Sequence, residues 1–243
     1  MIKPQPIAIN QEAGFSLLET IIAIIVATTF TLITLQTIVI GALFKSKALK
    51  RSEAINVVQQ DLEVIRSQTA RYKRSSLASA AVSGATSVTV ASSSSNFEAN
   101  DEIRIGSAGT YTISSVSGTT LNLGSGLSQN VNADDTVAAI GSCDAADVNS
   151  GFADQFRDFR HGSNESNDST LTYQETGTKS DRTYTIEVTF TPKNQEPFDV
   201  LIVEHRVYDL SASEFSSASD DTKEEALLTE NYSEVIPYAA FEC

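Results

Sequence analysis

The first feature of the sequence is a long apolar run that begins at Phe15, directly after a short polar stretch. In residues 15–44 almost every position is apolar, small or threonine, and Glu19 is the only charged residue. As an α-helix, about 30 residues extend over about 45 Å, which exceeds the roughly 30 Å thickness of the hydrocarbon core of a bilayer. The pattern therefore predicts one helix that crosses a membrane.

Helical periodicity continues beyond the apolar run, through residues 45–72. Charged and amide residues occupy most faces of this segment, while apolar residues recur with a roughly helical period. The predicted apolar stripe consists of Ala48, Leu49, Ile55, Val58, Leu62 and Ile65. We therefore expect the helix to leave the membrane and to pack this stripe against a sheet.

Short runs with strand character follow the helix, separated by turns rich in Ser, Gly, Asn and Asp. These runs occupy residues 86–90, 102–105, 110–113, 119–123 and 136–140. The sequence Val116-Ser117-Gly118-Thr119 is a hairpin signal. We predict a small all-β module, for which a barrel is one candidate arrangement. Its role is open between an adhesive or partner-binding surface and a passive spacer.

Beyond Cys143 the pattern predicts one short helix and three longer strands. The helix covers residues 152–160, and the strands lie around residues 170–175, 182–191 and 198–208, with a turn at residues 192–197. In the second strand apolar residues alternate with polar ones, as in a sheet with one buried face; they are Tyr184, Ile186, Val188 and Phe190. We expect this antiparallel sheet to pack on the half of the helix outside the membrane. The acidic tail in residues 211–230 is predicted to be a loop with a short helix.

Charge and cysteine content narrow the classes of function. The net charge is −14, so the polar part of the chain repels phosphate backbones and we do not expect it to bind nucleic acid. Basic residues gather in residues 45–74, and we interpret them as a solvated helix face beside lipid head groups. Cys143 and Cys243 are the only cysteines, and neither has a Cys or His at metal-ligand spacing. We expect a disulfide, which by closing a loop of about 100 residues would stabilise an exported domain by roughly 4–5 kcal/mol.

The N-terminus differs from an ordinary secretory signal, because a polar leader precedes Gly14 and the apolar run follows it. The segment Gly14-Phe15-Ser16-Leu17-Leu18-Glu19 resembles the class III signal of type IV prepilins and pseudopilins, whose pattern is G-F-[ST]-L-x-E. The resemblance extends from Gly14 to about Gln68. It implies that a prepilin peptidase on the cytoplasmic side cleaves between Gly14 and Phe15 and methylates the new amine of Phe15.

Glu19 is the anomaly of the apolar run. A carboxylate inside an apolar span costs roughly 2.5–3.5 kcal/mol, so it needs a partner. The nearest cation after cleavage is the α-amine of Phe15, in the same chain or in a neighbouring subunit. In the family that the segment resembles, this pairing sets the register of a new subunit in the fibre. The alternative is that Glu19 lies at the cytoplasmic interface and reaches water.

Three features depart from the family's pattern. Glu12 stands where a positive charge is common, which affects the efficiency of cleavage rather than its position. Lys45, Lys47 and Lys50 follow the span, so the positive-inside rule alone favours the opposite orientation, and we give the motif precedence. The span also lacks the mid-helix proline of many major pilins, which favours a minor pilin or a pseudopilin.

The sequence contains no recognisable catalytic constellation. His161 and His205 have no nucleophile or second ligand at useful spacing, and we interpret both as surface or sheet residues. Residues with oxygen ligands for calcium do not match the EF-hand spacing, so we interpret them as solvated loops; they are Asn164, Glu165, Asn167, Asp168, Asp144 and Asp147. We therefore expect neither enzymatic activity nor a cofactor.

Taken together, these features predict an α+β, pilin-like fold, with a long N-terminal α-helix packed on an antiparallel β-sheet and an inserted small all-β module. The expected segments are a removed leader at residues 1–14, a transmembrane half of the helix at 15–44 and an amphipathic half at 45–76. The β module is expected at residues 77–141, and the sheet region with the C-terminal tail at 142–243.

The expected function is that of a structural subunit, a minor pilin or pseudopilin, assembled into a type IV pilus or a related secretion fibre. Its expected partners are the prepilin peptidase, other pilin or pseudopilin subunits and the inner membrane. The expected location is the inner membrane, with one span and an extracytoplasmic C-terminal domain, and the cell-surface fibre after assembly. The alternative is a non-polymerising, membrane-anchored extracytoplasmic binding protein, which would retain its leader.

Overall fold

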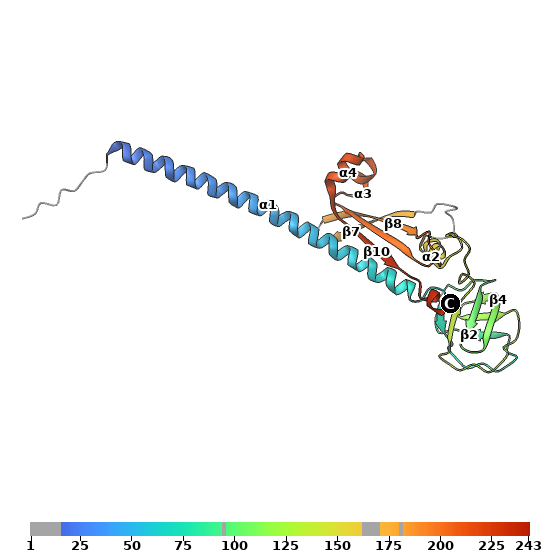
Figure 1. Ribbon diagram of the computed structural model, residues 1–243. Coiled ribbons are helices and arrows are strands. Elements are labelled where there is room, and N and C mark those ends of the chain that lie inside the picture. The colour runs from blue at the N-terminus through green and yellow to red at the C-terminus, as the bar shows by residue number, and fades with distance from the viewer. Residues whose placement is uncertain (1–15, 94–95, 162–170, 180–181) are drawn as a thin grey trace, which may run out of the picture. The chain divides into compact units, whose positions relative to one another are not determined.

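The computed structural model describes residues 16–93, 96–161, 171–179 and 182–243 (Figure 1). The chain divides into two compact units, Met1–Lys50 and Arg51–Cys243. Helix α1, Leu17–Thr69, begins in the first unit and ends in the second. The predicted α+β class is confirmed, because this helix is accompanied by two antiparallel sheets.

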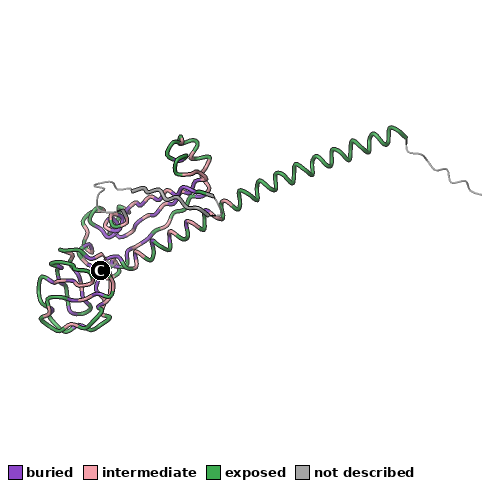
Figure 2. Tube along the Cα trace, turned by 180° about the vertical axis from the view of Figure 1, so that it is seen from behind, coloured by how far each residue is buried: buried purple, intermediate pink, exposed green. Residues whose placement is uncertain are grey.

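In the first unit α1 is exposed along its length. Its large apolar side chains face outward, with exposed fractions from 46% for Ile21 to 81% for Leu17, and the tube of Figure 2 is green throughout this part of the helix. Among the described residues, α1 is the one helix whose length and composition would let it cross a membrane. The predicted single candidate span is therefore present.

Threonine hydroxyls in this apolar segment are satisfied within the helix itself. Thr28, Thr31 and Thr37 each donate a hydrogen bond to the carbonyl four residues earlier, at 2.8–2.9 Å. A hydroxyl that bonds its own helix exposes no unpaired polar group to a surrounding apolar medium. The threonines are thus compatible with an apolar environment around α1.

The second unit contains a four-stranded antiparallel sheet in the order β10-β9-β8-β7. Its strands are β7 (Leu171–Lys179), β8 (Arg182–Pro192), β9 (Leu201–Tyr208) and β10 (Leu227–Val235). Helix α2, Phe152–His161, contributes Ala153 and Phe156 to the core beneath this sheet. The predicted alternation in β8 is confirmed, because Tyr184, Ile186, Val188 and Phe190 are all buried.

The end of α1 packs against this sheet through a narrow stripe. The stripe consists of Ala54, Val58, Leu62 and Ile65, which follow one another at three- and four-residue spacing and share a core with β8 and β9. The prediction that Val58, Leu62 and Ile65 belong to the packed stripe is confirmed. The same prediction is wrong for Ala48, Leu49 and Ile55, because all three are exposed. Ile55 follows Ala54 directly and is rotated by about 100° around the helix, away from the sheet.

A six-stranded antiparallel sheet occupies the middle of the chain, in the order β1-β6-β3-β4-β5-β2. Its strands are β1 (Arg74–Ser76), β2 (Ser87–Thr89), β3 (Glu102–Ile105), β4 (Gly109–Ser117), β5 (Thr120–Leu123) and β6 (Thr136–Ala139). The two edge strands are joined directly, because Ala78 N–H donates to the Thr89 carbonyl and Ala91 N–H donates to the Ser76 carbonyl, both at 2.8 Å. The sheet therefore closes on itself as a small barrel, which leaves no open edge.

Local turn chemistry in the barrel agrees with the sequence. Gly118 separates β4 from β5 and has a φ of +59°, a left-handed conformation that glycine adopts without steric cost. The five predicted runs correspond to β2 to β6. β1 lies within the residues that we assigned to the amphipathic helix, since α1 ends at Thr69, before the predicted end of its periodicity at Tyr72.

The C-terminal tail contains more regular structure than the sequence predicts. We expected a loop and one short helix here. The structure has two short helices instead, α3 (Ala212–Ser217) and α4 (Asp220–Ala226). Strand β10 follows them and was missed, and a 3₁₀ helix, η2 (Tyr238–Glu242), ends the chain. β10 is an edge strand in which only Thr229 and Val235 are buried, so its sequence lacks the alternation of a half-buried strand.

We predict that Ile65→Ala destabilises the second unit by about 2–5 kcal/mol, because the side chain is fully buried between α1 and the sheet. Ile55→Ala is the matched control on the same helix and should cost less than about 1 kcal/mol, since Ile55 is 41% exposed. Denaturant unfolding of the full chain in detergent, followed by near-ultraviolet circular dichroism, measures both. Equal losses in the two variants would contradict the stripe described above.

Candidate functional site

The described part of the chain begins at Ser16, directly after the predicted processing site. Gly14 and Phe15 are outside the described residues. Ser16 caps α1: its Oγ accepts a hydrogen bond from Glu19 N–H at 3.2 Å, and its carbonyl accepts from Glu19 N–H and Thr20 N–H at 3.0 and 3.1 Å. The serine of the signal segment therefore also starts the helix.

This cap was missed, although the sequence contains a signal for it. Ser16 and Glu19 have the spacing of a capping box, S-x-x-E. Glu19 thus lies in the first turn of α1, where unpaired N–H groups and the helix dipole favour a negative charge. Within the described part of the chain no cation forms an ion pair with Glu19, so the helix end provides its only described electrostatic compensation.

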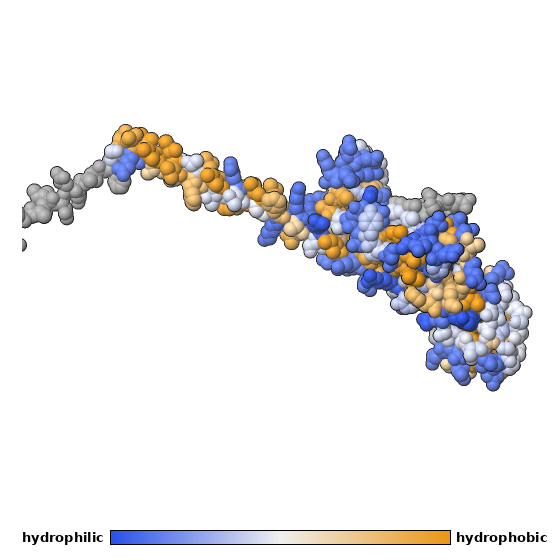
Figure 3. Space-filling view, viewed as in Figure 1, coloured by the Kyte–Doolittle hydropathy of each residue, from blue (hydrophilic) through white to orange (hydrophobic). Residues whose placement is uncertain are grey.

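A largely apolar surface follows Glu19, and the first part of α1 is predominantly orange in Figure 3. Its exposed side chains include Ile25, Phe30 and Phe44, at 59%, 72% and 69% exposure. An apolar surface of this extent is unfavourable in water. It requires cover from lipid, from other helices, or from both in succession.

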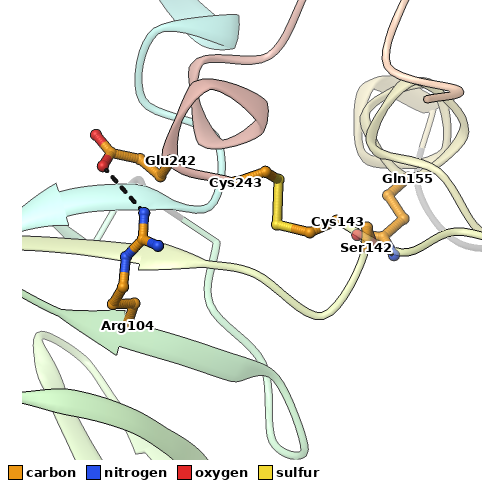
Figure 4. Close-up of a disulfide and its surroundings, with 6 residues drawn as sticks. All are labelled: Arg104, Ser142, Cys143, Gln155, Glu242 and Cys243. Atoms are coloured by element: carbon orange, nitrogen blue, oxygen red, sulfur yellow. Dashed lines mark hydrogen bonds and ion pairs between the residues drawn. A yellow bond between two sulfur atoms is a disulfide. The ribbon is translucent and has the colours of Figure 1, made fainter.

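The predicted disulfide between Cys143 and Cys243 is present, and it closes a sequence separation of 100 residues (Figure 4). Its surroundings hold the C-terminus to the barrel. Glu242 accepts a hydrogen bond from Arg74 Nε at 3.1 Å and lies 3.7 Å from Arg104, and Ala239 is fully buried. The disulfide therefore reinforces a turn that is also fixed by charge and burial.

A buried polar network connects α1, α2 and β9. His205 is fully buried, and its Nε2 lies 2.7 Å from Oδ2 of Asp61. Arg160 lies 3.6 Å from the other oxygen of Asp61 and donates a hydrogen bond to Gln68 at 2.6 Å. His205 is a sheet residue, as predicted, but its partner was not predicted. The network links α1, α2 and β9 to one another, and we assign it a structural role.

Potential metal ligands do not converge within the described residues. No group of three or more His, Cys, Asp or Glu side chains there could hold a metal ion. Asp147 accepts a hydrogen bond from Asn149 N–H at 2.9 Å, as in a local Asx turn. The side chain of His161, together with Asn164, Glu165, Asn167 and Asp168, lies outside the described residues.

Comparison of the chain with family models, with curated proteins and with solved structures gives no match. Functional arguments for this chain therefore depend on its own residues: the signal segment, the exposed apolar helix and the surfaces of the second unit.

One buried carboxylate stands apart from these features. Asp199, two residues before β9, is 8% exposed, and its Oδ1 has no hydrogen-bond partner among the described residues. Burial raises the pKa of Asp199 from 3.8 to about 6. A carboxyl with a raised pKa binds a proton more tightly in the folded than in the unfolded chain, so its contribution to stability is present at low pH and is lost as the pH rises from about 4 to about 6.

We predict that Asp199→Asn stabilises the protein by roughly 1–3 kcal/mol at pH 7.5, because it removes the cost of a buried charge. At pH 4 the gain should be small, since the native carboxyl is then protonated. Thermal unfolding of both chains between pH 4 and 8 measures the difference. Asp144→Asn, at an exposed position, is the control and should show no such pH dependence. A gain that is independent of pH would contradict the role of this charge.

Proposed function

We propose that this chain is a structural subunit, of the minor pilin or pseudopilin type, which a prepilin peptidase processes and which assembles into a type IV pilus or a related secretion fibre. The observation that carries the proposal is the segment from Gly14 to Glu19, whose last three residues form the first turn of a capped, exposed apolar helix. Cleavage between Gly14 and Phe15 would leave an amine two residues before Leu17, the first residue of α1.

The exposed apolar helix supports assembly on physical grounds. Before assembly its surface would be covered by lipid. In a fibre, packing of such helices against one another would keep the same side chains out of water. Relative to exposure in water, each fully buried large apolar residue contributes roughly 1.5–3 kcal/mol. The second half of α1 is already packed on its own sheet, so the first half is the part that remains available for other subunits.

Glu19 would give this packing its register. Its carboxylate is stabilised by the N-terminal turn of its own helix, and the amine of Phe15 in a neighbouring copy would complete its neutralisation. Because an uncompensated charge in an apolar medium is costly, packings that separate the two groups are disfavoured. A single pair of charges can thus select one arrangement among many similar apolar contacts.

The second unit would then lie outside the membrane. Its disulfide is typical of oxidising compartments, which include the bacterial periplasm and the cell surface. We therefore propose a single-pass inner-membrane protein with an extracytoplasmic domain, which enters a surface fibre. The alternative is a non-polymerising anchored binding protein, and the observation that favours it is a cleft of about 600 Å³ in the second unit, which could hold a ligand without assembly.

We predict that the mature protein begins at Phe15 and carries one additional methyl group on its amine. Intact mass and N-terminal sequencing of protein from native membranes measure this. The same chain from cells without the prepilin peptidase is the control and should retain residues 1–14. A retained leader in both strains would contradict the proposal and would favour the anchored binding protein.

We also predict that Glu19→Gln leaves cleavage intact but lowers incorporation into fibres by about tenfold or more, since loss of a pair worth about 1.4 kcal/mol corresponds to a factor of ten. Immunoblots of sheared fibres and of membranes measure the ratio. Glu63→Gln is the matched control, because Glu63 is an exposed carboxylate on the same helix beyond the apolar segment. Normal incorporation of Glu19→Gln would exclude a role for this charge in register.

A further inference from the structure

A cleft of about 600 Å³ lies where the turn after α1, the barrel and α2 meet. Tyr72 and Lys73 come from the turn, Glu98 and Asp101 precede β3, and Asp158 and Phe159 come from α2. These residues are brought together from three separate parts of the second unit. The cleft has no part in the processing or helix packing described above.

The charges of the cleft, taken with the neighbouring residues Arg157 and Asp154, do not balance. Lys73, whose side chain is 5% exposed, lies 2.7 Å from Asp101 and 3.7 Å from Glu98. Arg157, also 5% exposed, lies 2.8 Å from Asp158 and 2.8 Å from Asp154. Two cations thus share four carboxylates, and an excess of negative charge remains. The side chain of Glu98 is 78% exposed and that of Asp158 is 47% exposed, so the excess negative charge is accessible to solvent.

The wall of the cleft carries a polar group that is available for a ligand. Tyr72 is 4% exposed, lines the cleft, and its hydroxyl forms no hydrogen bond with any residue that the structure describes. Burial, and then the carboxylates of Glu98, Asp101 and Asp158, raise the pKa of Tyr72 far above its ordinary value. The phenol therefore stays neutral, and its oxygen can accept a hydrogen bond from an N–H donor.

An aromatic surface completes the site. The ring of Phe159 is 36% exposed, and its centroid lies 5.2 Å from that of Tyr72. An ammonium or guanidinium group over an exposed aromatic face gains roughly 0.5–2 kcal/mol. Negative charge, a free phenol oxygen and an aromatic face together suit a lysine or arginine side chain better than an anion or an apolar group.

We propose that this cleft binds a basic side chain from residues 45–51 of a second copy of the chain. Lys45, Lys47 and Arg51 are exposed on α1, directly after the apolar segment, and supply the complementary charge. They cannot reach the cleft of their own chain, because Arg51 lies about 27 Å along the helix axis from Thr69. A contact between copies satisfies both surfaces, and it rests on the proposed assembly of this chain.

The contact implies a stagger between the two copies. Arg51 and Thr69 of α1 lie about 27 Å apart along the helix axis, so Arg51 of one copy reaches the cleft of another only if the copies are shifted by about that distance or more. The charged contact therefore adds a second condition on the arrangement of the copies to the one that Glu19 would set.

The test uses two full-length chains with different tags, co-expressed in native cells. One carries Glu98→Cys and the other Lys47→Cys, and membranes are treated with a bifunctional maleimide. The native cysteines are joined in a disulfide and do not react. We expect a crosslinked heterodimer, at least about fivefold above the control pair in which Glu225→Cys, on α4, replaces Glu98→Cys.

A second variant tests charge rather than proximity. Reversing the flanking cations, by adding Lys45→Glu and Arg51→Glu to the Lys47→Cys chain, should lower the heterodimer by about fivefold or more. Lys193→Glu in the same chain is the control and should change it little. If the crosslink is insensitive to this reversal, the proposed recognition of a basic side chain is overturned.

The remaining outcomes separate this inference from the proposed function. A Leu35→Cys chain, altered within the apolar segment, should crosslink to its own copies when neighbours pack in the register that Glu19 would set, because that register shifts them by only about 6 Å. If Leu35→Cys crosslinks but the Glu98–Lys47 pair does not, the cleft contact is wrong and assembly stands. If neither crosslinks, both proposals fail. A crosslink from Glu98→Cys to a different protein, identified by mass spectrometry, would overturn the second copy as the occupant.

Discussion

The structure depends on one continuous helix, α1, whose two halves differ in burial. Its second half is fixed by the narrow contact of Ala54, Val58, Leu62 and Ile65 with β8 and β9. Helix packing through three- and four-residue spacing requires only one face, so the remaining faces of this half stay polar. The first half has no such contact, and its own apolar side chains are exposed on all of its faces. The sheet therefore determines where the exposed apolar part of α1 ends and the part packed into the second unit begins.

The barrel contains six strands and exposes no open sheet edge. Backbone hydrogen bonds from Ala78 to Thr89 and from Ala91 to Ser76 join its two edge strands, β1 and β2. A closed sheet offers no template for pairing with another chain. Helix α2 connects the two cores, since Phe152 contributes to the barrel core and Phe156 to the core under the four-stranded sheet. The disulfide and Glu242 then return the C-terminus to the barrel, so both ends of this unit are anchored.

Charge distribution links these parts to the proposed function. The apolar segment of α1 is followed by exposed basic residues, while the second unit carries excess acid, including the cleft beside Tyr72. A subunit with exposed basic residues in one part of the chain and excess acid in another has complementary surfaces for a second copy of itself. Apolar packing alone is poorly specific, because lipid and neighbouring helices offer similar surroundings. Charged groups can provide the discrimination that apolar packing lacks.

The sequence by itself determined the features that are local: the apolar run of α1, the alternation of Tyr184 to Phe190, the turn at Gly118 and the signal segment that ends at Glu19. Periods of 3.6 and 2 residues arise from local backbone geometry and can be read without a partner. Only the tertiary structure decided that His205 pairs with Asp61, 144 residues away, that β10 is a strand, and that Ala54 rather than Ile55 faces the sheet. It also brought Tyr72, Glu98 and Asp158 into one cleft. Such contacts depend on how whole elements pack, and no local period encodes them.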